Sequence, residues 1–173
     1  VHESADYDKA RAIIVNAKCR RLGVCNAAET LLVDEAAAEG FLPAALAELA
    51  ARGVTLHADE RAAAVAAAGG TPTVPAGEAD WETEYLAADL AVRVVGGVDE
   101  AIGHVNRYGP QHSRGEGAAV YANASTAFTD GAEFGLGAEI GISTQKLHAR
   151  GPFALDALTS YKYVLRGSGQ VRA

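Results

Sequence analysis

Short apolar runs alternate with Ala-rich segments through most of this chain. The runs of strand length cover residues 30–33, 54–57, 90–95, 118–122 and 158–165. Strands that alternate with helices are typical of parallel βαβ units, and right-handed crossovers place helices on both faces of such a sheet. The pattern therefore predicts an α/β fold with a mostly parallel sheet and helices on both faces.

Apolar residues at helical spacing fill the segments between these runs. The predicted helices run from Ser4 or Asp6 to about 18, and over about 35–51, 59–68 and 99–108. Asp34 and Asp59 are the expected N-terminal caps of the second and third helices, and Gly53 is expected to end the second. We expect Ala101, Ile102 and Val105 of the last helix to face inward, and residues 69–75 to form a loop.

Composition narrows the class of protein. With 173 residues, 49% hydrophobic and 21% charged, the chain has the profile of one soluble globular domain. No window approaches about 18 strongly apolar residues, and residues 1–4 do not resemble a secretory signal. We therefore expect a cytoplasmic protein with no membrane-spanning helix. The net charge of −7 argues against nucleic acid and anionic membranes as partners.

The two cysteines are too few for a disulfide scaffold, and the five scattered histidines predict no metal site. Cys25 follows Gly23 in a predicted loop, where free backbone N–H groups and the nearby Arg20 and Arg21 could stabilise a nucleophilic thiolate. The alternative is a small buried hydrophobe, which is the commoner state of a free cysteine. Cys19 is expected on a helix surface without a function.

Residues 128–141 are rich in glycine. Gly135 and Gly137 form a Gly-x-Gly pair, but the rest of the dinucleotide-binding fingerprint does not follow them. This density of glycine indicates either a loop that lies close against a ligand or a tight turn against the core.

Charged residues supply two further candidates. Lys146, His148 and Arg150 stand at alternate positions, so an extended loop would present them together as a cationic surface for phosphate or carboxylate. A solvated loop is the alternative. Glu82 and Glu84 precede the run at 90–95, where a glutamate could bind a ligand or remain an exposed acid.

Longer stretches of sequence carry a more specific signal. They cover residues 16–18, 23–33, 83–86, 90–92, 99–109, 123–152 and 158–163. In this order they closely resemble the γ-glutamyl phosphate reductase family of the aldehyde dehydrogenase superfamily. The resemblance implies an aldehyde-dehydrogenase-like catalytic domain and the NADPH-dependent reduction of L-glutamyl 5-phosphate to L-glutamate 5-semialdehyde, in proline biosynthesis.

The resemblance also implies roles for individual residues. Cys25 would be the nucleophile that forms a thioester, and its backbone N–H would help to hold the oxyanion. Glu84 would stand at the position of the glutamate that contacts the nicotinamide ribose. The residues implied on the substrate side are Asn26, Asn123, Gly135, Gly137, Lys146, His148 and Arg150.

Departures from the family concern length and a few residues. We expect residues 1–155 to form the catalytic domain, with an internal deletion near 113–118 and without the family's N-terminal cofactor domain. Residues 156–173 are expected to form a C-terminal strand for homo-oligomerisation. Ala127 replaces a basic residue that is usual in the family. Glutamate 5-kinase is a candidate partner.

These departures leave three hypotheses. In the first, the chain is the catalytic portion of a reductase, weakly active or inactive alone. In the second, Cys25 hydrolyses the acyl phosphate without a cofactor. In the third, the chain is a non-catalytic oligomerising fragment. Binding of NADPH would favour the first hypothesis, and phosphate release that depends on Cys25 would favour the second. Neither observation is expected under the third.

Overall fold

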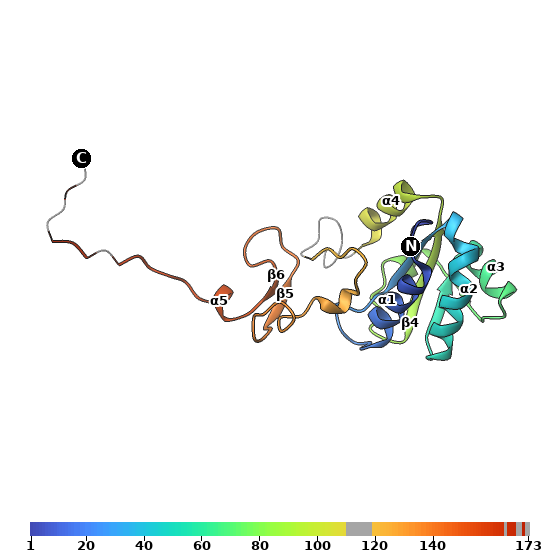
Figure 1. Ribbon diagram of the computed structural model, residues 1–173, viewed down its shortest axis with the longest axis horizontal. Helices are drawn as coiled ribbons and strands as arrows, with labels where there is room; N and C mark the ends of the chain where they lie inside the picture. The colour runs from blue at the N-terminus through green and yellow to red at the C-terminus, as the bar shows by residue number, and fades with distance from the viewer. Residues whose placement is uncertain (110–118, 165, 169–170, 172–173) are drawn as a thin grey trace.

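The computed structural model describes residues 1–109, 119–164, 166–168 and 171 (Figure 1). Its main body contains a four-stranded parallel sheet in the order β1-β4-β2-β3. The strands are β1 (Thr30–Asp34), β2 (Thr55–Ala58), β3 (Val74–Pro75) and β4 (Asp89–Val95). The three longer strands coincide with the predicted runs, so the α/β fold with a parallel sheet is confirmed.

The helices of the main body begin where the sequence predicts. They are α1 (Tyr7–Cys19), α2 (Glu35–Ala51), α3 (Glu60–Ala68) and α4 (Val98–Tyr108). The carboxylates of Asp6, Asp34 and Asp59 accept hydrogen bonds from backbone N–H groups in the first turns of α1, α2 and α3. Gly53 adopts φ 82° just beyond α2, a conformation that glycine reaches without strain.

The hydrophobic core lies between one face of the sheet and helices α1, α2 and α3. Its members come from all of these elements, and α2 contributes the fully buried Phe41, Leu42 and Leu46. Because side chains alternate along a strand, Leu90, Val92 and Val94 of β4 face this core. Arg93 faces the other side, where it contacts His104 of α4. Helices therefore cover both faces (Figure 1).

The inward face of α4 is only partly the predicted one, because Ala101 and Val105 are half-buried whereas Ile102 is exposed. Ile102 is 53% exposed, whereas His104 is only 7% exposed. The reason lies in the facing surface, because α4 meets the guanidinium of Arg93 and the ring of Trp81 instead of an aliphatic layer. The predicted loop at 69–75 also ends differently, in the short edge strand β3, where a proline is tolerated.

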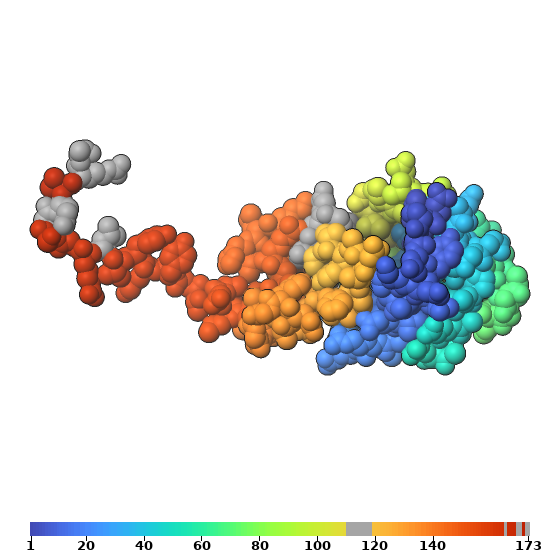
Figure 2. Space-filling view, viewed as in Figure 1, coloured from blue at the N-terminus to red at the C-terminus, as the bar shows by residue number. Residues whose placement is uncertain are grey.

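The remaining elements are small and lie toward the C-terminus. Two short 3₁₀ helices are η1 (Glu78–Trp81) and η2 (Thr126–Phe128). The strands β5 (Gly141–Ser143) and β6 (Gly151–Phe153) pair in an antiparallel manner, and α5 (Leu155–Leu158) follows them. This part of the chain extends from one side of the main body (Figures 1 and 2).

Two predicted strands do not form within the described residues. Residues 119–122 form no strand, and Val120 is 64% exposed. The segment predicted as a strand at 158–165 begins inside α5 and then leaves the main body as an extended tail (Figure 2). Tyr161 and Tyr163 of this tail are highly exposed. An apolar alternation becomes a strand only where a neighbouring strand supplies hydrogen bonds.

The predicted deletion near 113–118 lies outside the described residues. In the described part of the chain, we find no helix whose length and apolar character would allow it to cross a membrane.

Candidate functional site

The loop that carries Cys25 follows α1 and leads into β1. Two backbone hydrogen bonds shape it, from the N–H of Ala27 to the carbonyl of Val24 and from the N–H of Ala28 to the carbonyl of Ala17. The side-chain amide of Asn26 donates to the carbonyl of Thr129 over 2.9 Å. In return, the hydroxyl of Thr126 donates to the carbonyl of Asn26 over 2.6 Å. The Cys25 loop is thus fixed to η2, a hundred residues later in the chain.

Cys25 lies between two cavities. The first, the Arg-lined cavity, has a volume of 340 Å³ and is lined among others by Arg20, Arg21, Asn26, Thr129, Asp130 and Glu139. The second, the Trp-lined cavity, has a volume of 210 Å³ and is lined among others by Glu29, Trp81, Glu84, His104, Tyr108 and Thr126. Among the described residues, Cys25 alone lines both. A group bound covalently to its sulfur would therefore be reachable from two sides.

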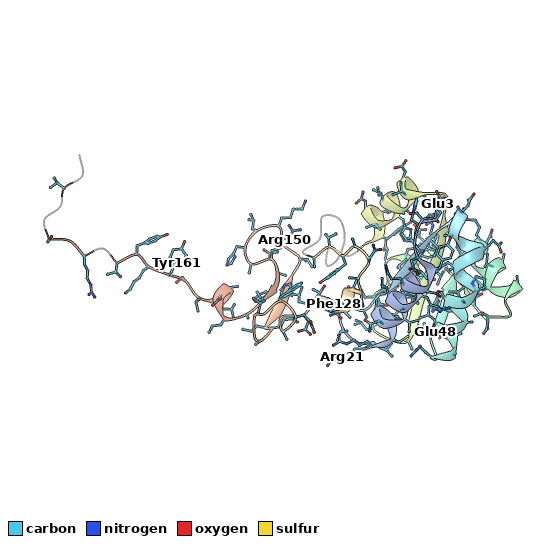
Figure 3. The ribbon with its side chains drawn as sticks, in the orientation of Figure 1. Glu3, Arg21, Glu48, Phe128, Arg150 and Tyr161 are labelled. Carbon is cyan, nitrogen blue, oxygen red and sulfur yellow. The ribbon has the colours of Figure 1, made fainter. Side chains whose placement is uncertain are left out.

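The Arg-lined cavity carries charges of both signs. Arg20 and Arg21 come from the end of α1, and Asp130 and Glu139 come from the Gly-rich segment. Figure 3 shows Arg21 at the edge of the main body, on the side where Phe128 lies. Guanidinium groups bind carboxylate and phosphate, and carboxylates bind an ammonium group. This combination suits an amino acid that carries an additional anionic group.

The thiol of Cys25 is not pre-activated by the neighbouring arginines. Burial raises its pKa most, the carboxylates of Glu139 and Glu84 raise the pKa further, and a backbone hydrogen bond opposes them. Arg20 and Arg21 are not among the groups that shift this pKa, so the expectation that they stabilise the thiolate receives no support here. Partial burial of the sulfur and the carboxylates of Glu139 and Glu84, one lining each cavity, together keep the pKa of this thiol above its ordinary value.

Replacing Glu139 by Gln is expected to lower the pKa of Cys25, because it removes the larger of the two carboxylate effects on this thiol. At a fixed pH below that pKa, alkylation of Cys25 by iodoacetamide should become about two- to fivefold faster, since the thiolate is the reacting species. The rate is measured by mass spectrometry across a pH series in a Cys19→Ser background. An unchanged or slower reaction at every pH would contradict this account.

Glu84 lies on a loop that is held by a half-buried cluster of polar side chains. His57 of β2 faces two carboxylates, with Nδ1 3.2 Å from Asp80 and Nε2 2.9 Å from Asp89. Tyr85 stacks on the ring of His57 and donates its hydroxyl to Asp80 over 2.6 Å. Burial and the bond to Asp80 raise the pKa of Tyr85, and the same bond lowers the pKa of Asp80. The cluster fixes both ends of the loop on which Glu84 faces the cavity.

A buried ion pair lies beneath the Trp-lined cavity. The Nζ atom of Lys18 is 2.7 Å from Oε2 of Glu29, and the Lys18 side chain is 0% exposed. The second oxygen of Glu29 accepts a hydrogen bond from the backbone N–H of Leu86, which adopts the left-handed φ of 51°. The pair therefore connects α1 with the loop that carries Glu84.

The structure brings three of the sequence-predicted site residues together. Cys25 and Asn26 line the Arg-lined cavity, while Glu84 lines the other cavity on the far side of Cys25. Asn123 lines neither and borders a separate hollow beside Val1 and Lys9.

The remaining five line neither of the two cavities beside Cys25. They are Gly135, Gly137, Lys146, His148 and Arg150. Both glycines adopt positive φ angles in turns, at 74° and 71°, and His148 lines a hollow beside α5. Figure 3 shows Arg150 on the β5–β6 segment, beyond Phe128. Their predicted contacts with the substrate receive no support from this placement, because none of the five lines either cavity beside Cys25, although Ile142 of β5 reaches the Arg-lined cavity.

Sequence reasoning missed several residues of the two cavities. Glu139 stands inside the Gly-rich segment but was not distinguished from it, and Trp81 and His104 carried no signal at all. The ion pair of Lys18 and Glu29 was not predicted from the sequence either. No group of three or more metal-binding side chains occurs in the residues that the structure describes, and the sequence predicted no metal site.

The chain is similar in sequence to proteins of known function. No protein-family model matches the chain. γ-Glutamyl phosphate reductase of Thermobifida fusca is 52% identical over 188 residues, which cover 99% of this chain and 44% of that protein. The same enzyme of Enterococcus faecalis is 53% identical over 189 residues, covering 100% and 44%. The alignment lengths exceed the 173 residues of this chain, so both relatives contain positions that it lacks.

A solved structure agrees with these relatives. The crystal structure of γ-glutamyl phosphate reductase from Thermotoga maritima matches with a TM-score of 0.88 and 47% identity, over 99% of this chain and 45% of that one. The chain thus spans less than half the length of the relatives it matches. The aldehyde-dehydrogenase-type fold expected from the resemblance is consistent with this structural match.

Proposed function

The chain is a homologue of the γ-glutamyl phosphate reductases, and from that premise we propose that it supplies the thiol-bearing part of such an enzyme. The proposed reaction reduces L-glutamyl 5-phosphate to L-glutamate 5-semialdehyde with NADPH. The observation that carries the proposal is the position of Cys25 between two cavities of different chemistry. One suits a zwitterionic, anionic substrate and the other a flat ring.

The first chemical step would take place at the sulfur of Cys25. Its thiolate attacks the acyl carbon, the bond from that carbon to the phosphate oxygen breaks, and inorganic phosphate leaves a thioester behind. The backbone N–H of Cys25 would stabilise the oxyanion. Arg20 and Arg21 would attract the two anionic ends of the substrate, while Asp130 or Glu139 would face its ammonium group.

Arg20 would also compensate for the departure at Ala127. The family usually carries a basic side chain at that position, which would place a positive charge near the substrate. Here the Arg20 guanidinium lies within 3.4 Å of the Ala127 carbonyl and donates to it. A positive charge is therefore present beside the same backbone position, although it comes from the end of α1.

The Trp-lined cavity fits the nicotinamide end of a cofactor. Trp81 and Tyr108 provide aromatic walls, and Glu84 provides a carboxylate that could accept a hydrogen bond from a ribose hydroxyl. NADPH, when bound, supplies the hydride that reduces the thioester. After reduction, the carbon–sulfur bond breaks and Cys25 returns to the thiolate. The rest of a cofactor-binding site would belong to the part of the relatives that this chain does not cover.

We further propose that the enzyme acts as a homo-oligomer in the cytoplasm. The exposed side chains of Tyr161 and Tyr163 support a role of the C-terminal tail in contacting a second copy of the chain. Glutamate 5-kinase remains a proposed partner, because its acyl phosphate product would be protected from water by direct transfer.

The reverse reaction tests the proposal. Glutamate 5-semialdehyde, phosphate and NADP⁺ are mixed with this chain alone and with the complete polypeptide that contains it, and NADPH absorbance is followed. We expect little or no signal from the 173-residue chain alone and a clear signal from a complete reductase. Phosphate released from glutamyl 5-phosphate without NADPH, in a manner dependent on Cys25, would favour simple hydrolysis. Neither activity in any form would overturn both assignments.

A further inference from the structure

His104 is a buried polar side chain in the wall of the Trp-lined cavity. Its ring contacts Trp81 edge-on, with centroids 5.5 Å apart, and lies 4.8 Å from the ring of Tyr108. It is 7% exposed. Nothing in the proposed reaction so far requires a histidine at this position.

The position of the proton on the His104 ring follows from its neighbour. Nη1 of Arg93 lies 3.2 Å from Nδ1 of His104. Because a guanidinium can only donate hydrogen bonds, Nδ1 must accept and therefore carries no proton. Burial, together with the positive charge of Arg93, lowers the pKa of His104 and favours the neutral ring. In a neutral ring with a bare Nδ1, the proton resides on Nε2.

Arg93 is itself held in place, so this arrangement is pre-formed. Its guanidinium pairs with Glu100 over 3.1 Å and lies 5.6 Å from the centre of the Trp81 ring. The Nε2–H of His104 is thus oriented by a fixed group behind it. Among the residues that the structure describes, this N–H has no hydrogen-bond acceptor. A buried donor without a partner costs free energy, unless a ligand or water supplies the acceptor.

We propose that His104 binds the group that occupies the Trp-lined cavity, by donating its Nε2–H to a carbonyl oxygen of a planar aromatic amide. The inference rests on the proposed function, which places a nicotinamide in this cavity. The carboxamide oxygen of that ring is the acceptor that His104 lacks. One residue would then recognise the amide, while Trp81 and Tyr108 contact the flat ring.

The test measures binding rather than turnover, in the complete polypeptide that contains this chain. His104→Phe keeps an aromatic ring but removes the donor, so the dissociation constant for NADPH should rise about tenfold. His104→Gln retains an N–H group and should stay within about threefold of the unaltered protein. Adenosine 2′,5′-bisphosphate, which lacks the nicotinamide, should bind all three proteins equally and shows that the variants are folded.

A second readout concerns the tautomer directly. Long-range ¹H–¹⁵N correlation spectra should show a protonated Nε2 and a bare Nδ1 in His104, and the Nε2–H resonance should shift when NADPH is added. Unchanged NADPH affinity in His104→Phe, or a proton on Nδ1, would overturn the assignment of His104 alone. If the unaltered protein does not bind NADPH, the proposed function itself fails, and the ligand assigned to His104 fails with it.

Discussion

Replacing Cys25 by Ser is expected to abolish reduction of glutamyl 5-phosphate, with a loss of at least about a thousandfold in kcat. A serine hydroxyl is not ionised near neutral pH, and the carboxylates of Glu84 and Glu139 on either side of position 25 would oppose its ionisation further. The change is small, since oxygen replaces sulfur on an exposed loop residue. The measurement is NADPH oxidation by the complete polypeptide at saturating glutamyl 5-phosphate.

Cys19 offers a matched control for this variant. It is the second free cysteine of the chain, and it lines neither of the two cavities beside Cys25. Cys19→Ser should therefore keep the rate within about twofold. Incubation with acyl phosphate in the absence of NADPH should add the mass of a glutamyl group to the unaltered protein but not to the Cys25→Ser variant. Comparable turnover in Cys25→Ser would exclude the covalent mechanism.

Removing the positive charge of Lys18 is expected to destabilise the chain by about 3–5 kcal/mol. Lys18 is fully buried and Glu29 is 15% exposed, so Lys18→Met would leave the Glu29 carboxylate with a weakly solvated, unpaired charge. Methionine fills a similar volume, which separates the electrostatic effect from that of a cavity. Urea unfolding, followed by circular dichroism, measures the difference in the free energy of unfolding.

The double variant Lys18→Met/Glu29→Gln shows whether the loss of stability comes from the unpaired charge or from altered packing. It removes both charges, so the free energy of unfolding should recover to within about 1–2 kcal/mol of the unaltered chain. The loss of stability in the double variant could instead equal the sum of the losses in Lys18→Met alone and Glu29→Gln alone. In that case the two side chains do not interact as their 2.7 Å separation implies. The hydrogen bond from Leu86 to Glu29 could survive in this variant, because a glutamine side-chain oxygen still accepts.

The predictable part of the fold is the part specified by local sequence. Asp34 caps a helix because its carboxylate reaches an N–H two residues ahead, and this requires nothing from the rest of the chain. The strand at 90–95 was recognisable as an apolar run that only Arg93 interrupts. The segments at 118–122 and 158–165 show the limit of this reasoning. They have the apolar character of strands, but pairing depends on a partner edge that no local pattern reveals.

The candidate site also contains residues that local sequence predicts and residues that depend on contacts between distant segments. Cys25 and Asn26 are adjacent in sequence, so their common position beside one cavity was accessible from the chain alone. Glu84 lies beside Cys25 only because His57 of β2 pairs with Asp80 and Asp89 at the two ends of its loop. No local pattern around Glu84 reveals these contacts. Lys146 and Arg150 stand between β5 and β6 and line neither cavity, so their contact with the substrate stays a prediction.

The single tryptophan of the chain stands in the wall of the Trp-lined cavity and is 8% exposed. Indole fluorescence from these 173 residues therefore originates at one place, and its emission should have the short wavelength typical of an apolar environment. A reduced nicotinamide ring absorbs light in the range where tryptophan emits. Its arrival beside Trp81 would quench the emission by energy transfer, whereas a substrate on the arginine side of Cys25 would leave it nearly unchanged. The molecule thus carries an intrinsic optical reporter for one half of its site, with no label required.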